Sequence, residues 1–272
     1  MLKLKNGIQM RNFFILFAVV LLSCSSAIGQ TSIKEAAALV EKGKAAANNK
    51  DNAAALIYFT KAIKINPKNS EAYANRAVLY DKLKKFPETL ADCNKVIELN
   101  PNVSTVYENR ANLYHKSKKF AEAIADAGKA IELDPATVWP FFIRGDCYIH
   151  EFEYQKAVWS LNIYLERDKQ DLRAYNRRGY AYTALGKYKE AIDDCTKGLA
   201  SPEYRADSFY NRANAHHMLG KFSEAIFDAT AAIAIDPNQP FYYRTRSLAY
   251  LALGEEKKAL PDTIMFKYLT SK

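Results

Sequence analysis

Residues 70–103 read SEAYANRAVLYDKLKKFPETLADCNKVIELNPNV, and residues 104–137 read STVYENRANLYHKSKKFAEAIADAGKAIELDPAT. Both segments are 34 residues long, and they share the strings NRA, LY, KKF, AD and IEL at the same spacing. Self-similarity at a fixed period of this length is typical of a repeat array, in which each unit is one supersecondary element.

The same register extends in both directions from these two segments. Pro67, Pro101 and Pro135 are 34 residues apart, and Pro237 lies three such periods after Pro135. The register predicts seven units, of which we expect the last to cap the array. They comprise residues 36–69, 70–103, 104–137, 138–171, 172–205, 206–239 and 240–272.

Counted from the first residue of a unit, the fourth place is mostly aromatic and the eighth is always small. The fourth-place residues are Leu39, Tyr73, Tyr107, Phe141, Tyr175, Phe209 and Tyr243, and those at the eighth are Gly43, Ala77, Ala111, Gly145, Gly179, Ala213 and Ser247. These places share one face of a helix with 3.6 residues per turn. Gly186, Gly220 and Gly254 are expected to end the first helix of their units. The pattern predicts two antiparallel helices per unit, with small residues where their backbones approach.

Arginine and aspartate recur in two further columns. The seventh place is Arg in six consecutive units, and the 23rd place is Asp in five of those six. The predicted pairs within a unit are Arg76–Asp92, Arg110–Asp126, Arg178–Asp194, Arg212–Asp228 and Arg246–Asp262. In the fourth unit Ser160 replaces the acid, so Arg144 must find another partner. The recurring acid favours a structural role for these arginines over the alternative, which is that they bind carboxylates of a ligand.

From Ala36 to about Lys272 this pattern resembles the tetratricopeptide repeat family. The resemblance implies an all-α fold, a right-handed solenoid of stacked hairpins in which each unit contacts mainly its neighbours. It also implies a non-enzymatic scaffold that binds a peptide or protein partner in a concave groove. The alternative function is a structural or assembly role in an envelope or secretion complex, through the convex face or the ends of the array.

The resemblance further implies that the groove is lined by the second, fifth, ninth, twelfth and thirteenth places of each unit. The predicted groove residues are Glu108, Asn112, Trp139, Phe142, Asp146, Arg173, Asn176, Tyr180, Asp207, Tyr210, Asn214 and Arg244. Large apolar side chains on a solvated face usually mark a binding surface. The alternative is that these aromatics pack between adjacent first helices and are partly buried, and both can hold at once.

Other classes of function find little support in the sequence. The net charge of +9 is spread along the chain without a dense basic run, which argues against nucleic-acid binding. No HExxH, GxSxG or glycine-rich phosphate loop is present, so no catalytic residue is assigned and no cofactor is expected. Cys93, Cys147 and Cys195 have no metal-binding spacing, so no metal is expected either.

Residues 1–29 have the three-part layout of an export signal: basic residues, an apolar run over 13–22, and small residues after it. Cleavage after Gly29 would leave Gln30 as the new terminus, whereas Leu21 to Cys24 resembles a bacterial lipobox, in which the Cys is lipidated. An uncleaved membrane anchor is the third alternative. In each case we expect an exported protein of the bacterial periplasm or envelope, either an outer-membrane lipoprotein or secreted. Its membrane contact would be limited to the lipid at Cys24 or to that anchor.

Overall fold

The computed structural model describes residues 30–271, so the predicted signal segment and Cys24 lie outside the described residues. Residues 30–48 are helical, and thirteen further helices follow along the described chain without a strand. They are α2 (Asn52–Ile65), α3 (Ser70–Lys82), α4 (Phe86–Leu99), α5 (Ser104–Lys116), α6 (Phe120–Leu133), α7 (Trp139–His150), α8 (Tyr154–Arg167), α9 (Leu172–Ala184), α10 (Tyr188–Gly198), α11 (Arg205–Met218), α12 (Phe222–Ile235), α13 (Pro240–Ala252) and α14 (Glu256–Thr270). The predicted all-α repeat fold is confirmed.

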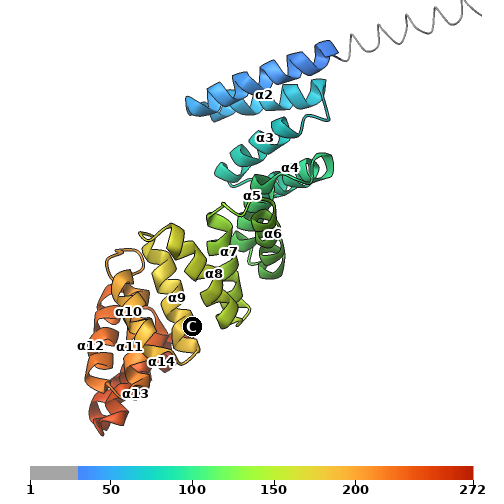
Figure 1. Ribbon diagram of the computed structural model, residues 1–272. Helices are drawn as coiled ribbons and strands as arrows, with labels where there is room; N and C mark the ends of the chain where they lie inside the picture. Colours follow the sequence, from blue (N-terminus) through green and yellow to red (C-terminus); the bar gives the residue numbers. More distant parts are fainter. Residues whose placement is uncertain (1–29, 272) are drawn as a thin grey trace, which may run out of the picture. The chain divides into compact units, whose positions relative to one another are not determined.

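The chain divides into two compact units, one ending at Leu113 and the other beginning at Tyr114, so that the division falls within α5. We call them the N-terminal and C-terminal units. In the N-terminal unit α3 packs against α4, and in the C-terminal unit the hairpins are α7 with α8, α9 with α10, α11 with α12 and α13 with α14 (Figure 1). None of the described helices combines the length and the apolar character needed to cross a membrane.

Each hairpin turns at the same place of its unit, where the backbone enters the left-handed region. The φ angles there run from 57° to 75°, at Lys50, Lys84, Lys118, Phe152, Gly186, Gly220 and Gly254. Glycine adopts this conformation without strain, whereas a side chain with a Cβ costs about 1–2 kcal/mol. The three glycines therefore stand where the turn requires them, and the other four units form the same turn despite that cost.

Small residues allow the two helices of a hairpin to approach closely. A Cβ added at Gly145 would lie 3.4 Å from the carbonyl oxygen of Ala157, and one added at Gly179 would lie 3.4 Å from that of Ala191. Both alanines are completely buried. The core between the helices is therefore built around a backbone contact that repeats with the sequence period.

Candidate functional site

The first helices of the last three units lie side by side, because α11 contacts both α9 and α13. Stacking in this register leaves one face of each helix uncovered. A groove of about 500 Å³ lies on this face, and we call it the C-terminal groove. It is lined by Thr183, Ala184, Tyr188, Tyr210, Asn214, His217, Met218, Phe241, Arg244, Thr245 and Leu248.

Three of the residues predicted for a binding groove come together here. They are Tyr210, Asn214 and Arg244. The hydroxyl of Thr245 donates a hydrogen bond of 2.8 Å to the side-chain oxygen of Asn214. Burial raises the pKa of Tyr210, whose hydroxyl therefore stays protonated at neutral pH. Arg244 is exposed and brings a positive charge to the groove.

The groove also contains exposed apolar side chains, of which Met218 and Leu248 were absent from the predicted set, whereas Phe241 stands at the predicted second place. Phe241 is 49% exposed, and Met218 and Leu248 are also exposed. Leu248 occupies the ninth place of its unit and Met218 the thirteenth, which are two of the places assigned to the groove. The register alone could therefore have identified both residues. Their exposure gives the groove an apolar surface next to the charge of Arg244.

Acidification is expected to weaken the fold through His150, His216 and His217 of the C-terminal unit. Burial lowers the pKa of His217 in the groove, and it is the largest cause lowering the pKa of His150 and His216. An unfolded histidine takes up its proton near pH 6.5, as about that value is its unperturbed pKa. The folded side chains protonate only at lower pH, so the unfolded state binds more protons in between. The free energy of unfolding must therefore fall as the pH drops below about 6.5.

The measurement is the melting temperature between pH 7.5 and pH 5. We expect it to fall over this range in the wild type, and to fall less in His217→Gln, which removes one of the three groups. The wild type and the variant should differ little in slope above pH 7, where histidine is neutral in both states. An equally steep fall in His217→Gln would contradict the assignment.

The predicted exposure is wrong for Asp146 and Asn176, which are buried, and Phe142 is buried as in the alternative that the aromatics pack between adjacent first helices. The cause is the packing of successive first helices, since α7 contacts α9 and α9 contacts α11. Phe142 stacks on Trp139 with ring centroids 4.8 Å apart. The Asn176 side-chain nitrogen donates to the hydroxyl of Ser208 on α11 at 2.9 Å.

Asp146 is the centre of a buried polar cluster between three successive units. Its carboxylate lies 2.6 Å from Nε2 of His115 and 2.9 Å from Nε of Arg177. Burial alone would raise the pKa of Asp146, but the hydrogen bond with His115 and the charge of Arg177 outweigh it, and the pKa lies below its ordinary value. The carboxylate is therefore ionised, with Oδ2 bound to His115 and Oδ1 in an ion pair with Arg177.

The remaining predicted groove residues lie elsewhere. The guanidinium of Arg173 lies over the ring of Trp139, which is partly buried. Asp207 accepts a hydrogen bond of 3.1 Å from the hydroxyl of Tyr242, and Tyr180 is exposed and contacts the ring of Tyr154. Glu108 and Asn112 are partly exposed on the part of α5 that belongs to the N-terminal unit.

Four arginines of the seventh place form bidentate pairs with aspartate. Arg76 binds Asp92, Arg178 binds Asp194, Arg212 binds Asp228 and Arg246 binds Asp262, with N–O distances of 2.6–2.9 Å. Arg110 and Asp126 belong to the same repeat, but Arg110 lies in the N-terminal unit of the structure and Asp126 in the C-terminal unit. Their pairing therefore stays a prediction.

No reactive or metal-binding group stands out in residues 30–271. Cys93, Cys147 and Cys195 are free and buried, and burial raises the pKa of Cys147 and Cys195 to about 12. Such thiols are protonated and inert at neutral pH. Among the described residues, no group of His, Cys, Asp and Glu side chains could hold a metal ion.

Solved structures with the same fold include the following three proteins. YrrB, described as a tetratricopeptide repeat protein with an unusual peptide-binding site, is 23% identical with a TM-score of 0.63, over 69% of this chain and 97% of YrrB. A tetratricopeptide repeat protein from Parabacteroides merdae ATCC 43184 is 20% identical with a TM-score of 0.59, over 87% and 93% of the two chains. MamA is 23% identical with a TM-score of 0.54, over 62% and 92%. At these identities the likeness concerns the fold alone.

No curated protein matches the sequence. A family model described as the tetratricopeptide repeat matches residues 70–103, 104–136, 172–200 and 206–239. A second model of the same description matches residues 36–69. The chain belongs to the tetratricopeptide repeat family and is a scaffold for protein–protein interaction.

Proposed function

We propose that the C-terminal groove binds an extended segment of a partner protein, and that this binding is the function of the chain. The observation that carries the proposal is the convergence of Phe241, Met218 and Leu248, all exposed, with Arg244 in one cavity. Exposed apolar side chains grouped in a concavity mark interaction sites, and aromatic and Arg residues dominate the energetics of interfaces.

The chemistry of the groove defines the segment that it would accept. An apolar side chain of the ligand would be covered by Phe241 and Leu248, and a neighbouring carboxylate would face Arg244. His217 adds no charge to the groove at pH 7, because burial lowers its pKa. A segment with one acidic residue next to apolar residues therefore fits better than a strongly acidic or basic one.

The size of the cavity is consistent with a short peptide segment. A volume of about 500 Å³ falls within the range of about 300–1,000 Å³ that is usual for ligand pockets. YrrB, which has the same fold, is described as having an unusual peptide-binding site. This supports a peptide as the ligand class here.

The experiment selects peptides from a random display library on the full chain and measures their affinity for matched variants. We expect Phe241→Ser and Arg244→Glu to weaken binding at least tenfold, about 1.4 kcal/mol. The control is Phe227→Ser, which removes a Phe that is 69% exposed on α12 and lies outside the groove. All three variants should keep the wild-type melting temperature. Equal loss in Phe227→Ser, or none in Phe241→Ser, would rule the groove out.

We also propose that the protein is exported to the bacterial envelope, on the evidence of residues 1–29 of the sequence. Mass spectrometry of the native N-terminus tests this. A terminus at Gln30 supports soluble release, and a diacylated Cys24 supports a lipoprotein. An intact Met1 in the cytoplasmic fraction would refute export.

The alternative proposal, assembly through the end of the array, rests on one observation. Leu260 and Ile264 are exposed one turn apart on α14, the last described helix. Replacing both with Ser should leave peptide selection on the groove unchanged. If this double variant abolished incorporation into a larger complex while the groove variants did not, the assembly role would be preferred.

A further inference from the structure

The seventh-place arginines follow one rule of hydrogen bonding from unit to unit. Four of them use Nε and Nη2 for the aspartate of their own repeat, and Nη1 for a polar side chain at the 25th place of the preceding repeat. These second acceptors are Thr60 for Arg76, Asn162 for Arg178, Thr196 for Arg212 and Thr230 for Arg246, at 2.8–3.3 Å. In these four sites, each of the three guanidinium nitrogens therefore donates to an acceptor.

Arg144 in α7 is the exception, because both acceptors are replaced. Ser160 stands at the place of the aspartate, and Gly128 stands at the 25th place of the preceding unit. Arg144 Nε donates to the Ser160 hydroxyl at 3.2 Å, whereas its buried Nη2 has no hydrogen-bond partner. Space is left where the second acceptor would be, since a Cβ added at Gly128 would meet no atom within 4 Å.

Aromatic contacts do not replace the missing acceptors. The guanidinium carbon of Arg144 lies 5.2 Å from the ring centre of Phe141 and 4.9 Å from that of Trp159. Rings stabilise a guanidinium through its faces, whereas its five N–H groups donate within its plane. Burial lowers the pKa of Arg144, and no carboxylate offsets this effect. The cation is desolvated without the partner that its counterparts have.

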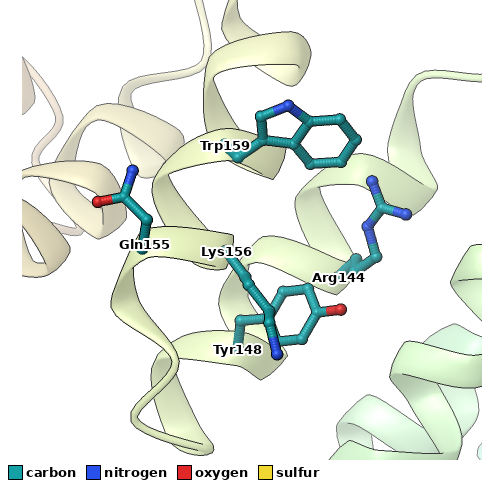
Figure 2. Close-up of a pocket in the computed structure, with 5 residues that line it drawn as sticks. All are labelled: Arg144, Tyr148, Gln155, Lys156 and Trp159. Atoms are coloured by element: carbon teal, nitrogen blue, oxygen red, sulfur yellow. The ribbon is translucent and has the colours of Figure 1, made fainter.

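A pocket of about 390 Å³ opens beside this guanidinium, lined by Arg144, Tyr148, Gln155, Lys156 and Trp159. In the view of Figure 2, Trp159 lies above the pocket, Tyr148 below it and the guanidinium of Arg144 at its side. Lys156 adds a second cation, whose ion pair with Glu153 at 3.3 Å is exposed and therefore weak. Trp159 is 55% exposed, so its indole forms a wall of the pocket at the protein surface.

We propose that this pocket binds an aspartate or glutamate side chain of a partner protein, which supplies to Arg144 the carboxylate that the fourth unit lacks. The planar fork of a guanidinium matches the two oxygens of a carboxylate, and bidentate pairs are among the strongest charge-assisted hydrogen bonds. Lys156 adds attraction, and the indole of Trp159 covers the aliphatic part of the ligand. The pocket lies at α7 and α8, so this contact is separate from the C-terminal groove.

The probe is the blocked peptide acetyl-Ala-Glu-Ala-amide, with its Gln counterpart as the neutral control. The chain has two tryptophans, so Trp139→Phe leaves Trp159 as the reporter in fluorescence titrations of the full chain. We expect saturable binding of the Glu peptide with a dissociation constant on the order of 1 mM, and at least tenfold weaker binding of the Gln peptide. Equal responses to the two peptides would overturn the proposal.

The chain offers a variant that fills the site from within. Ser160→Asp restores the residue that the other repeats carry, so its carboxylate should form an ion pair with the guanidinium of Arg144. We expect this variant to have a higher melting temperature and no fluorescence response to the Glu peptide. Gly128→Thr restores only the second acceptor and should weaken the response less. Undiminished binding by Ser160→Asp would show that the guanidinium is not the receptor. If that variant does not fold, Arg144→Gln decides the same question by removing the cation.

Two further ligands test whether the bound anion is an acidic side chain, a terminal carboxylate or a phosphate. Acetyl-Ala-Gln-Ala with a free terminal carboxylate tests a chain terminus, and inorganic phosphate tests a phosphate group. We expect both to bind more weakly than the Glu peptide, because neither combines a carboxylate with an aliphatic stem that the indole can cover. Tighter binding of phosphate would contradict the assignment to an acidic side chain.

Discussion

Asp228→Ala should lower the free energy of unfolding by about 3–5 kcal/mol, the usual result of removing one partner of a buried ion pair. Asp228 is 1% exposed and accepts hydrogen bonds from Nε and Nη2 of Arg212 at 2.8 and 2.7 Å. Without the carboxylate, the largely buried guanidinium would keep its charge and lose most of its hydrogen bonds. The penalty arises from the cation that remains, more than from the attraction that is lost.

The matched control is Asp193→Ala, which removes an exposed aspartate of the same unit of the structure. Surface substitutions of this kind usually change stability by about 0.5 kcal/mol or less. A double-mutant cycle of Asp228→Ala and Arg212→Met then gives the interaction energy of the pair. The double variant leaves neither charge unpaired, so it should be more stable than Asp228→Ala alone. Chemical denaturation followed by circular dichroism measures all five proteins: the wild type, the three single variants and the double variant. A loss below about 1 kcal/mol in Asp228→Ala would contradict the argument.

Such a pair also links neighbouring units. Arg212 binds Asp228 within its own hairpin and, through Nη1, the hydroxyl of Thr196 in the preceding hairpin. In a repeat array, stability is a sum of terms within units and terms between nearest neighbours. One side chain therefore contributes to both kinds of term. Replacing it should reduce the cooperativity of unfolding as well as its free energy.

The period of the sequence made the fold predictable because the decisive contacts are local to one unit. Tyr73 and Tyr107 occupy equivalent places, and so do the small residues where the helices of a hairpin meet. Arg178 and Asp194 are 16 positions apart and lie in a single hairpin, so the columns alone placed them at matching heights. Contacts within one repeat can therefore be predicted from the sequence without knowing how the repeats stack.

Contacts between units were less accessible to sequence reasoning. Phe142, Asp146 and Asn176 were assigned to the solvated face, yet the next first helix covers each of them, and how closely it approaches depends on the stacking of hairpins. The open place beside Arg144 has the same origin, because Gly128 matters only once the 25th place of one unit is seen to contact the seventh place of the next. The helical period does not determine that distance.

Gly179→Leu should be the second large loss, at about 3 kcal/mol or more, since overpacking a tight core costs about 1–3 kcal/mol even for added methylenes. A Cβ at this position would lie 2.7 Å from Sγ of Cys195 and 3.4 Å from the carbonyl oxygen of Ala191. The thiol is completely buried and has little room to move, and the carbonyl belongs to the backbone of α10. The two helices would have to separate, which would also disturb the neighbouring pair of Arg178 and Asp194.

Gly128→Ala is the matched control, because it also replaces a glycine inside a helix but finds open space around the new Cβ. It should stabilise the protein by up to about 1 kcal/mol through helix propensity alone. Thermal and chemical denaturation should therefore move in opposite directions for the two variants. If Gly179→Leu melted within a few degrees of the wild type, the close approach of α9 and α10 would not be a condition of the fold. The repeated small residues of the eighth place would then need another explanation.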